Sequence, residues 1–123
     1  MDFSIDAALQ ADHDRLCAFV RDEIVPLEAD RKNYDSYGNI DMAVLQTLRA
    51  KVKAAGLWAP QIPREQGGLG YGPTGMAVLY EAMNYSIFGP VAFNCAAPDD
   101  GNMYILNKVA TQAQKDRWLT PII

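Results

Sequence analysis

The chain has 123 residues, of which 50% are hydrophobic and 21% are charged, a composition typical of one globular domain with its own core. Its formal net charge is −4, from 11 basic and 15 acidic residues. The basic residues form no cluster, which argues against a nucleic-acid partner held mainly by phosphate contacts. No apolar run is long enough to span a bilayer. The acidic amino terminus lacks the basic region and apolar stretch of a signal peptide, so the sequence predicts a cytoplasmic protein.

Residues able to bind metal or act as nucleophiles are few. Cys17 and Cys95 lie far apart without CxxC spacing, and two reduced, buried thiols are the simplest interpretation. A disulfide or a nucleophile stays open as an alternative. His13 is the single histidine and has no HxxxH or HxxE companion, so no metal site is predicted.

The first predicted element is an amphipathic helix over residues 6–25. Pro26 lacks a backbone donor and its ring collides with the carbonyl of Asp22, so this helix is expected to end or kink there. Residues 31–39 are rich in Asn, Asp, Ser and Gly and are predicted to form a loop. The apolar residues of the helix recur at steps of three, four and seven, and they are Leu9, Leu16, Phe19, Val20 and Ile24.

A second helix is predicted to begin after Asp41, whose side chain can cap it. Lys51 and Lys53 lie near its C-terminal end, where positive charge suits the helix dipole. Gly56 follows at the position where a left-handed cap favours glycine. Its expected apolar stripe is Met42, Leu45, Leu48 and Val52.

A third helix is predicted to begin at Thr74 or Gly75 and to stop at Gly89-Pro90. Its expected apolar face is Met76, Leu79, Tyr80, Met83 and Ile87. The apolar segment 91–97 follows, and Asp99 or Asp100 can then cap a short helix that runs through Val109.

Thr111 and Gln114 fit a capping box, which predicts a last helix carrying Trp118, Leu119 and Ile122. No segment alternates clearly enough to predict a strand. The fold class predicted from these elements is all-α, an up-and-down bundle of five to six helices around one core.

The glycine-rich stretch 60–75 (PQIPREQGGLGYGPTG) does not match a phosphate-binding loop. A P-loop needs a lysine, and this stretch has none. A dinucleotide fingerprint needs GxGxxG directly after a strand, and here the third glycine is misplaced. The stretch is better explained as a tight reversal between two helices, in which glycine permits positive φ angles.

Two motifs, in this order, resemble the N-terminal helical domain of acyl-CoA dehydrogenases. The first is Gly56-Leu57, then Ile62-Pro63, then residues 65–70 (EQGGLG). The second is residues 110–121 (ATQAQKDRWLTP), in which Ala110 replaces the glycine usual before the Thr/Ser. Residues 94–103 (NCAAPDDGNM) resemble a subgroup fused to kinase-like domains. The similarity spans essentially all 123 residues.

The resemblance implies an FAD-dependent oxidoreductase that introduces an α,β double bond into acyl-CoA thioesters. It further implies that residues 1–123 form the N-terminal helical domain of a larger flavoprotein. The middle β domain and the C-terminal helical domain, which carries the catalytic glutamate, are absent. The isoleucine ending directly after a helix also favours a piece of a longer chain. No residue here is therefore predicted to be catalytic, and Glu23, Glu28, Glu65 and Glu81 are expected to be solvated or paired at the surface.

By position, Phe93, Asn94, Ala97 and Gly101 resemble places that line the family's acyl pocket. Phe93 and Ala97 can equally be core residues, and Asn94 can equally be a helix cap. The resemblance implies acyl-CoA and an electron-transfer acceptor as partners. A homo-oligomer is also predicted, because the fragment should expose apolar surface that normally meets the missing domains. FAD is expected in the parent protein and not on this fragment alone. The alternative function is a free-standing helical interaction module without catalysis.

Overall fold

The computed structural model describes residues 4–123, and within them the only extended pairing is an isolated bridge between Tyr34 and Ile40. No helix in this part of the chain is both long and apolar enough to cross a membrane. Short 3-10 turns, η2 and η3, occupy Arg31–Asn33 and Arg64–Gln66. The longer helices are α1 (Ala7–Phe19), α3 (Met42–Ala54), α4 (Pro73–Met83) and α6 (Asp99–Val109). The shorter segments are η1 (Val20–Ile24), α2 (Val25–Glu28), α5 (Gly89–Ala92), α7 (Gln112–Gln114), η4 (Lys115–Leu119) and α8 (Thr120–Ile122).

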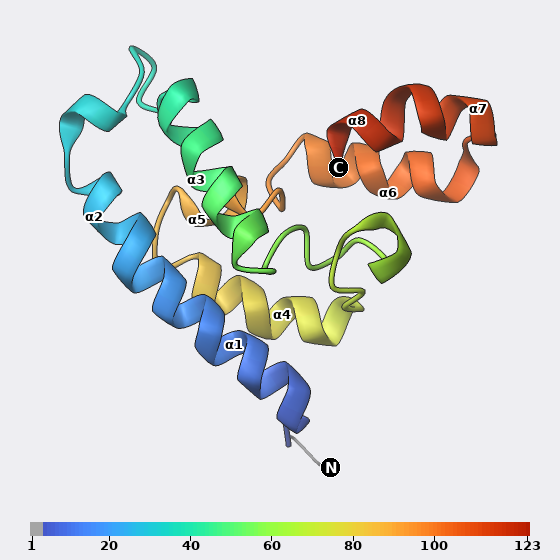
Figure 1. Ribbon diagram of the computed structural model, residues 1–123, viewed down its shortest axis with the longest axis horizontal. Helices are drawn as coiled ribbons and strands as arrows, with labels where there is room; N and C mark the ends of the chain where they lie inside the picture. Colours follow the sequence, from blue (N-terminus) through green and yellow to red (C-terminus); the bar gives the residue numbers. More distant parts are fainter. Residues whose placement is uncertain (1–3) are drawn as a thin grey trace.

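These segments join into six helices, because α1–η1–α2 and α7–η4–α8 are each continuous (Figure 1). The predicted all-α class and the number of helices are therefore confirmed for residues 4–123. Helix α1 packs against α4, and α5 packs against both α3 and α4. The hairpin of α6 and α7–α8 lies to one side of this body. Met103 and Leu119 are the fully buried apolar side chains of the hairpin.

The first helix does not end at Pro26. It runs on through α2 to Glu28. The π-helical turn η1, which comes directly before α2, allows this continuation. In this turn the N–H of Val25 donates to the carbonyl of Val20, five residues back. In a regular α-helix the ring of Pro26 would collide with the carbonyl of Asp22, four residues back. The wider π-helical turn changes this spacing and so relieves the collision. Glu28 holds the C-terminal end of this first helix, because its carboxylate accepts from Ser86 Oγ (2.5 Å) and from the N–H of Ile87 (3.2 Å).

The predicted start of α3 is confirmed, and one member of its stripe is wrong. Asp41 caps the helix by accepting from the N–H of Ala43 (2.9 Å) and of Val44 (3.2 Å). At the other end, Gly56 has φ 67°, the left-handed cap. Leu45, Leu48 and Val52 are buried, but Met42 is 62% exposed, because it is the first helical residue and lies outside the stripe.

The third predicted helix is shorter than expected. It begins at Pro73 and ends at Met83, and Ile87, in the turn beyond it, is 68% exposed. Gly89-Pro90 starts α5 rather than stopping α4. A Cβ at Gly89 would lie 1.9 Å from the carbonyl oxygen of Met83. This glycine therefore allows α5 to approach the end of α4.

The caps of the last two helices differ from each other. Asp99 and Asp100 lie inside the first turn of α6, and neither caps it, because Pro98 occupies the N-cap position. The carboxylates still lie at the positive end of the helix dipole. The capping box of Thr111 and Gln114 is confirmed.

The glycine-rich stretch is a compact reversal, as predicted. Gly67 and Gly70 have φ of 94° and 74°. The N–H of Gly67 donates to the carbonyl of Arg64, and that of Gly68 donates to the carbonyl of Pro63. These donors are used within the loop, so it differs from a phosphate cradle, which presents free N–H groups.

Candidate functional site

A hollow of about 450 Å³ lies between α4 and α6. Helix α4 contributes Met76 and Tyr80, and α6 contributes Gly101 and Met103. An apolar cavity with a few polar groups is the common form of a small-molecule site. The remaining lining residues are Gln61, Ile62, Tyr71, Gly72, Pro73, Asp100, Tyr104 and Asn107.

The polar side chains of this hollow are hydrogen-bonded to one another and to the backbone. Gln61 Nε2 donates to the carbonyl of Asn94 (2.8 Å) and to Asp100 Oδ1 (3.0 Å). The Cys95 thiol donates to Gln61 Oε1 (3.1 Å). The Tyr80 hydroxyl donates to the carbonyl of Cys95 (2.7 Å). The hollow therefore has one polar edge, formed where the loop after α3 meets the segment before α6.

The Cys95 thiol and the Tyr80 hydroxyl at this edge are both held in their neutral forms. Burial, and then the nearby negative charge of Asp100, raises the pKa of the Cys95 thiol far above its usual range. Burial likewise raises the pKa of the Tyr80 hydroxyl. A thiolate is the nucleophilic form of cysteine, so a nucleophilic role for Cys95 is not supported. Both cysteines are free thiols, which excludes the disulfide alternative.

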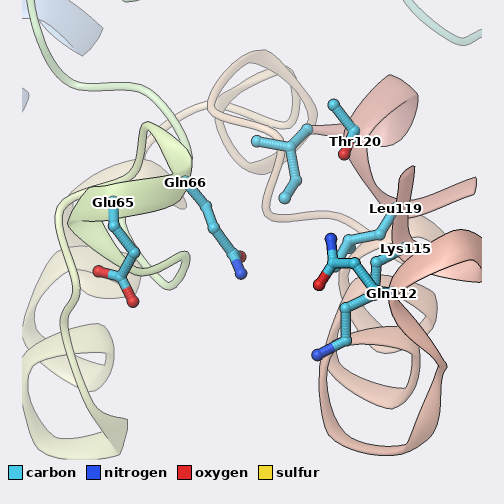
Figure 2. A pocket seen from close by; sticks show the side chains of 7 residues that line it. Glu65, Gln66, Gln112, Lys115, Leu119 and Thr120 are labelled. Carbon is cyan, nitrogen blue, oxygen red and sulfur yellow. The ribbon is translucent and has the colours of Figure 1, made fainter.

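A second hollow, of about 380 Å³, separates η3 from the last helix. In Figure 2, Glu65 and Gln66 extend from η3 on one side. Gln112, Lys115 and Thr120 extend from the last helix on the other. Its lining is mostly polar and includes charges of both signs, so it offers less apolar wall than the α4–α6 hollow. Among residues 4–123, no group of three His, Cys, Asp or Glu could hold a metal ion.

Comparison with known proteins identifies the family. Residues 8–123 match the model of "Acyl-CoA dehydrogenase, N-terminal domain". The chain belongs to the acyl-CoA dehydrogenase family. It is 32% identical over 126 residues to mouse acyl-CoA dehydrogenase family member 10, covering 97% of this chain. It is 35% identical over 133 residues to a Mycobacterium tuberculosis protein named "Probable acyl-CoA dehydrogenase FadE2", covering all of this chain.

A solved structure described as that of "a putative acyl-CoA dehydrogenase from Mycobacterium abscessus" superposes with a TM-score of 0.81 at 33% identity, over 98% of this chain. The chain spans 12% of the mouse protein, 31% of FadE2 and 32% of the solved chain. Members 10 and 11 are both among the matched relatives, which supports the subgroup resemblance noted for residues 94–103.

The four pocket residues predicted for this acyl-CoA dehydrogenase domain do not line one common cavity. Phe93 is fully buried and packs edge-to-face on Phe19, with ring centroids 5.8 Å apart. Gly101 lines the α4–α6 hollow. Ala97 lines a separate hollow of about 470 Å³ beside Met42. The predicted substrate-binding role of the four therefore stays a prediction, and Gly101 is the member that lies at the candidate site.

Asn94 caps a helix, which was the alternative interpretation of this residue. It has φ 62° and follows the C-terminal end of α5. The N–H of Cys95 donates to the carbonyl of Pro90, and that of Asn94 donates to the carbonyl of Val91, the Schellman pattern. Asn94 Nδ2 also donates to the carbonyl of Ile122 (3.0 Å). Asn94 thus joins α5 to the hairpin of this acyl-CoA dehydrogenase domain.

Sequence reasoning missed several lining residues of the hollow. Met76, Tyr80 and Met103 were recognised only as helix-face residues, and their periodicity does not tell a core wall from a cavity wall. Gln61 and Tyr71 gave no signal, because their partners lie 39 and 59 positions away in the sequence.

Proposed function

We propose that this chain is the N-terminal part of an FAD-dependent acyl-CoA dehydrogenase that introduces an α,β double bond into acyl-CoA thioesters. We further propose that the α4–α6 hollow forms part of the wall that receives the acyl chain. The observation that carries the proposal is the apolar lining of this hollow by Met76, Met103 and Gly101, in a chain matched to the family over residues 8–123. Methionine side chains suit a flexible hydrocarbon because they adapt their shape.

The glycine-rich loop of this chain does not fit the pyrophosphate of FAD. The N–H groups of Gly67, Gly68 and Gly70 donate to carbonyls of the same loop, and the bond from Gly70 to Ile62 is 2.8 Å long. They therefore offer no site for a pyrophosphate. We propose that the rest of the parent protein holds the cofactor.

The test uses the full-length protein that contains this chain. We expect it to purify with flavin, and we expect acyl-CoA to bleach the visible flavin absorbance. The length of the acyl chain is varied to find the longest one accepted. A full-length protein without flavin, or one whose spectrum no acyl-CoA changes, contradicts the proposal.

A second experiment tests whether the acyl chain lies in the α4–α6 hollow. A Cβ at Gly101 would meet nothing within 4 Å, so Gly101→Leu is expected to fill the hollow without a clash with the backbone. We expect kcat/KM for the longest substrates to fall by about tenfold, with short ones less affected. The control is Asn102→Leu, the neighbouring exposed position on α6. An equal loss at all chain lengths, or none, contradicts this assignment.

A further inference from the structure

Three successive carbonyl groups at the end of α5 are each held by a different donor. The N–H of Ala59 donates to the carbonyl of Phe93 (3.0 Å). The next two carbonyls, of Asn94 and Cys95, accept from Gln61 Nε2 (2.8 Å) and from the Tyr80 hydroxyl (2.7 Å). The loop after α3 and the middle of α4 therefore fix the course of the chain as it leaves α5.

Gln61 also reaches the first turn of α6. Its Nε2 bonds Asp100 Oδ1 in the first turn of that helix, while its Oε1 accepts from the Cys95 thiol. One amide group thus contacts the chain on both sides of residues 96–99. A glutamine amide offers two N–H donors and an acceptor oxygen, and all three are used here.

The consequence concerns the α4–α6 hollow, because Gln61, Asp100 and Gly101 all line it. Near the other end of α6, Asn107 Oδ1 accepts from Gln66 Nε2 (3.2 Å). Asn107 lines the hollow, but Gln66, in the glycine-rich loop, does not. Gln61 therefore ties the first turn of α6 to the loop after α3.

We propose that Gln61 is a positioning residue that sets the width of the α4–α6 hollow, by holding the first turn of α6 against the loop after α3. Its effect on which acyl chains are accepted rests on the function proposed above. The tie itself is a property of this chain and is tested independently of activity.

The first test uses Cys95 as a reporter in a chain carrying Cys17→Ser. Cys95 is 4% exposed, so its reaction with an aryl disulfide reagent measures local opening of segment 94–100. Gln61→Leu keeps the bulk of the side chain and removes its hydrogen bonds. We expect the reaction to become faster by about tenfold or more.

Variants at Asp100 distinguish the loss of its hydrogen bond with Gln61 from the loss of its negative charge. Asp100→Ala removes the acceptor without touching the bond from Cys95 to Gln61, and we expect a similar acceleration. Asp100→Asn removes the same charge but keeps an acceptor oxygen, so we expect a rate within about twofold of the parent. Gln66→Leu, the matched amide outside the hollow, is expected to behave like the parent. Far-ultraviolet circular dichroism checks that each variant keeps its helices.

An unchanged rate in Gln61→Leu overturns the proposal. A rate in Asp100→Asn as high as in Asp100→Ala also overturns it, because charge would then be the cause.

In the full-length enzyme, Gln61→Leu is expected to change KM more than kcat, and to affect substrates with long acyl chains more than those with short ones. Uniform effects at every chain length would overturn the role in substrate selection. If the full-length protein oxidises no acyl-CoA, the proposed function fails while the thiol measurement still decides whether the tie exists.

Discussion

Single glycines in the 60–75 loop serve different physical needs. Gly67 and Gly70 adopt positive φ angles, which other residues reach only at a cost. Gly68 instead provides space, because a Cβ there would lie 2.1 Å from the carbonyl oxygen of Ile62 and 2.4 Å from that of Ala59. The sequence predicted the turn from glycine content, but it could not tell which glycine was needed for its angle and which for its size.

Gly68→Ala is expected to destabilise the protein strongly. Both obstructing atoms are backbone atoms of the same loop, so they cannot swing aside, and overpacking of this kind costs about 1–3 kcal/mol or more. Gly72→Ala is the matched control, because a Cβ there meets nothing within 4 Å. Urea unfolding followed by circular dichroism measures both. Equal stability of the two variants would show that the loop shifts freely.

Tyr71 gives a pH-dependent prediction. Its hydroxyl donates to Asp12 Oδ2 (2.7 Å). Burial, and then this bond to Asp12, raises the pKa of Tyr71 from 10.0 to about 12. Because the folded state favours the neutral phenol, the stabilisation is complete below about pH 10 and is lost as the pH rises towards 12.

We therefore expect the free energy of unfolding to fall over that pH range, and to fall less steeply in Tyr71→Phe. At neutral pH the variant should be less stable by about 1–2 kcal/mol, since Asp12 loses a donor. Tyr37→Phe is the control, because Tyr37 is 88% exposed. Identical pH profiles for Tyr71→Phe and the parent protein would contradict the assignment.

The two prolines that lie beyond the first turn of a continuous helix are accommodated in the same way. Pro26 follows the π-helical turn η1, and Pro121 follows η4, each two residues after the turn ends. The sequence shows the clash that a proline brings, but it does not show that one wider turn relieves it. Helix existence was therefore predictable from apolar periodicity, whereas the end of the first helix was not.

The hairpin of α6 and α7–α8 is expected to open more readily than the body. Side-chain hydrogen bonds join the two, including those from Asn94 to Ile122 and from Trp58 Nε1 to the carbonyl of Ile123 (2.8 Å). Large apolar side chains of the hairpin are exposed instead of packed, as Ile105 and Val109 show at 57% and 77%. Few buried contacts mean a low free energy of local opening.

Hydrogen exchange followed by mass spectrometry tests this expectation. Amides of α6 and η4 should exchange faster than those in the middle of α1 and α4, which pack against each other. Slower or equal exchange in the hairpin would mean that the side-chain bonds hold it as firmly as core packing holds the body.

Across the fold, the sequence predicted the features that neighbouring residues determine and missed those that distant residues determine. The caps at Asp41 and Thr111 depend on neighbours within three residues, and both are confirmed. The hollow depends on pairs such as Gln61 with Asp100, 39 positions apart. No local pattern encodes such a pair. The motif resemblance supplied the family, but it did not bring the four predicted pocket residues to one cavity.

Helix α6 leaves large apolar side chains exposed. Ile105 and Val109 lie one helical turn apart and both are more than half exposed, so they share a face. Soluble monomers rarely leave large apolar patches uncovered, and this chain spans only 31% of the length of its relative FadE2. We expect residues 1–123 alone to self-associate at high concentration and to bind no FAD. Light scattering should show that the double variant Ile105→Lys and Val109→Lys shifts the population to monomer. The control is Ala113→Lys, at an exposed position on α7. A parent chain that stays strictly monomeric, or a purified fragment that carries stoichiometric flavin, would show that these helices are complete without further polypeptide.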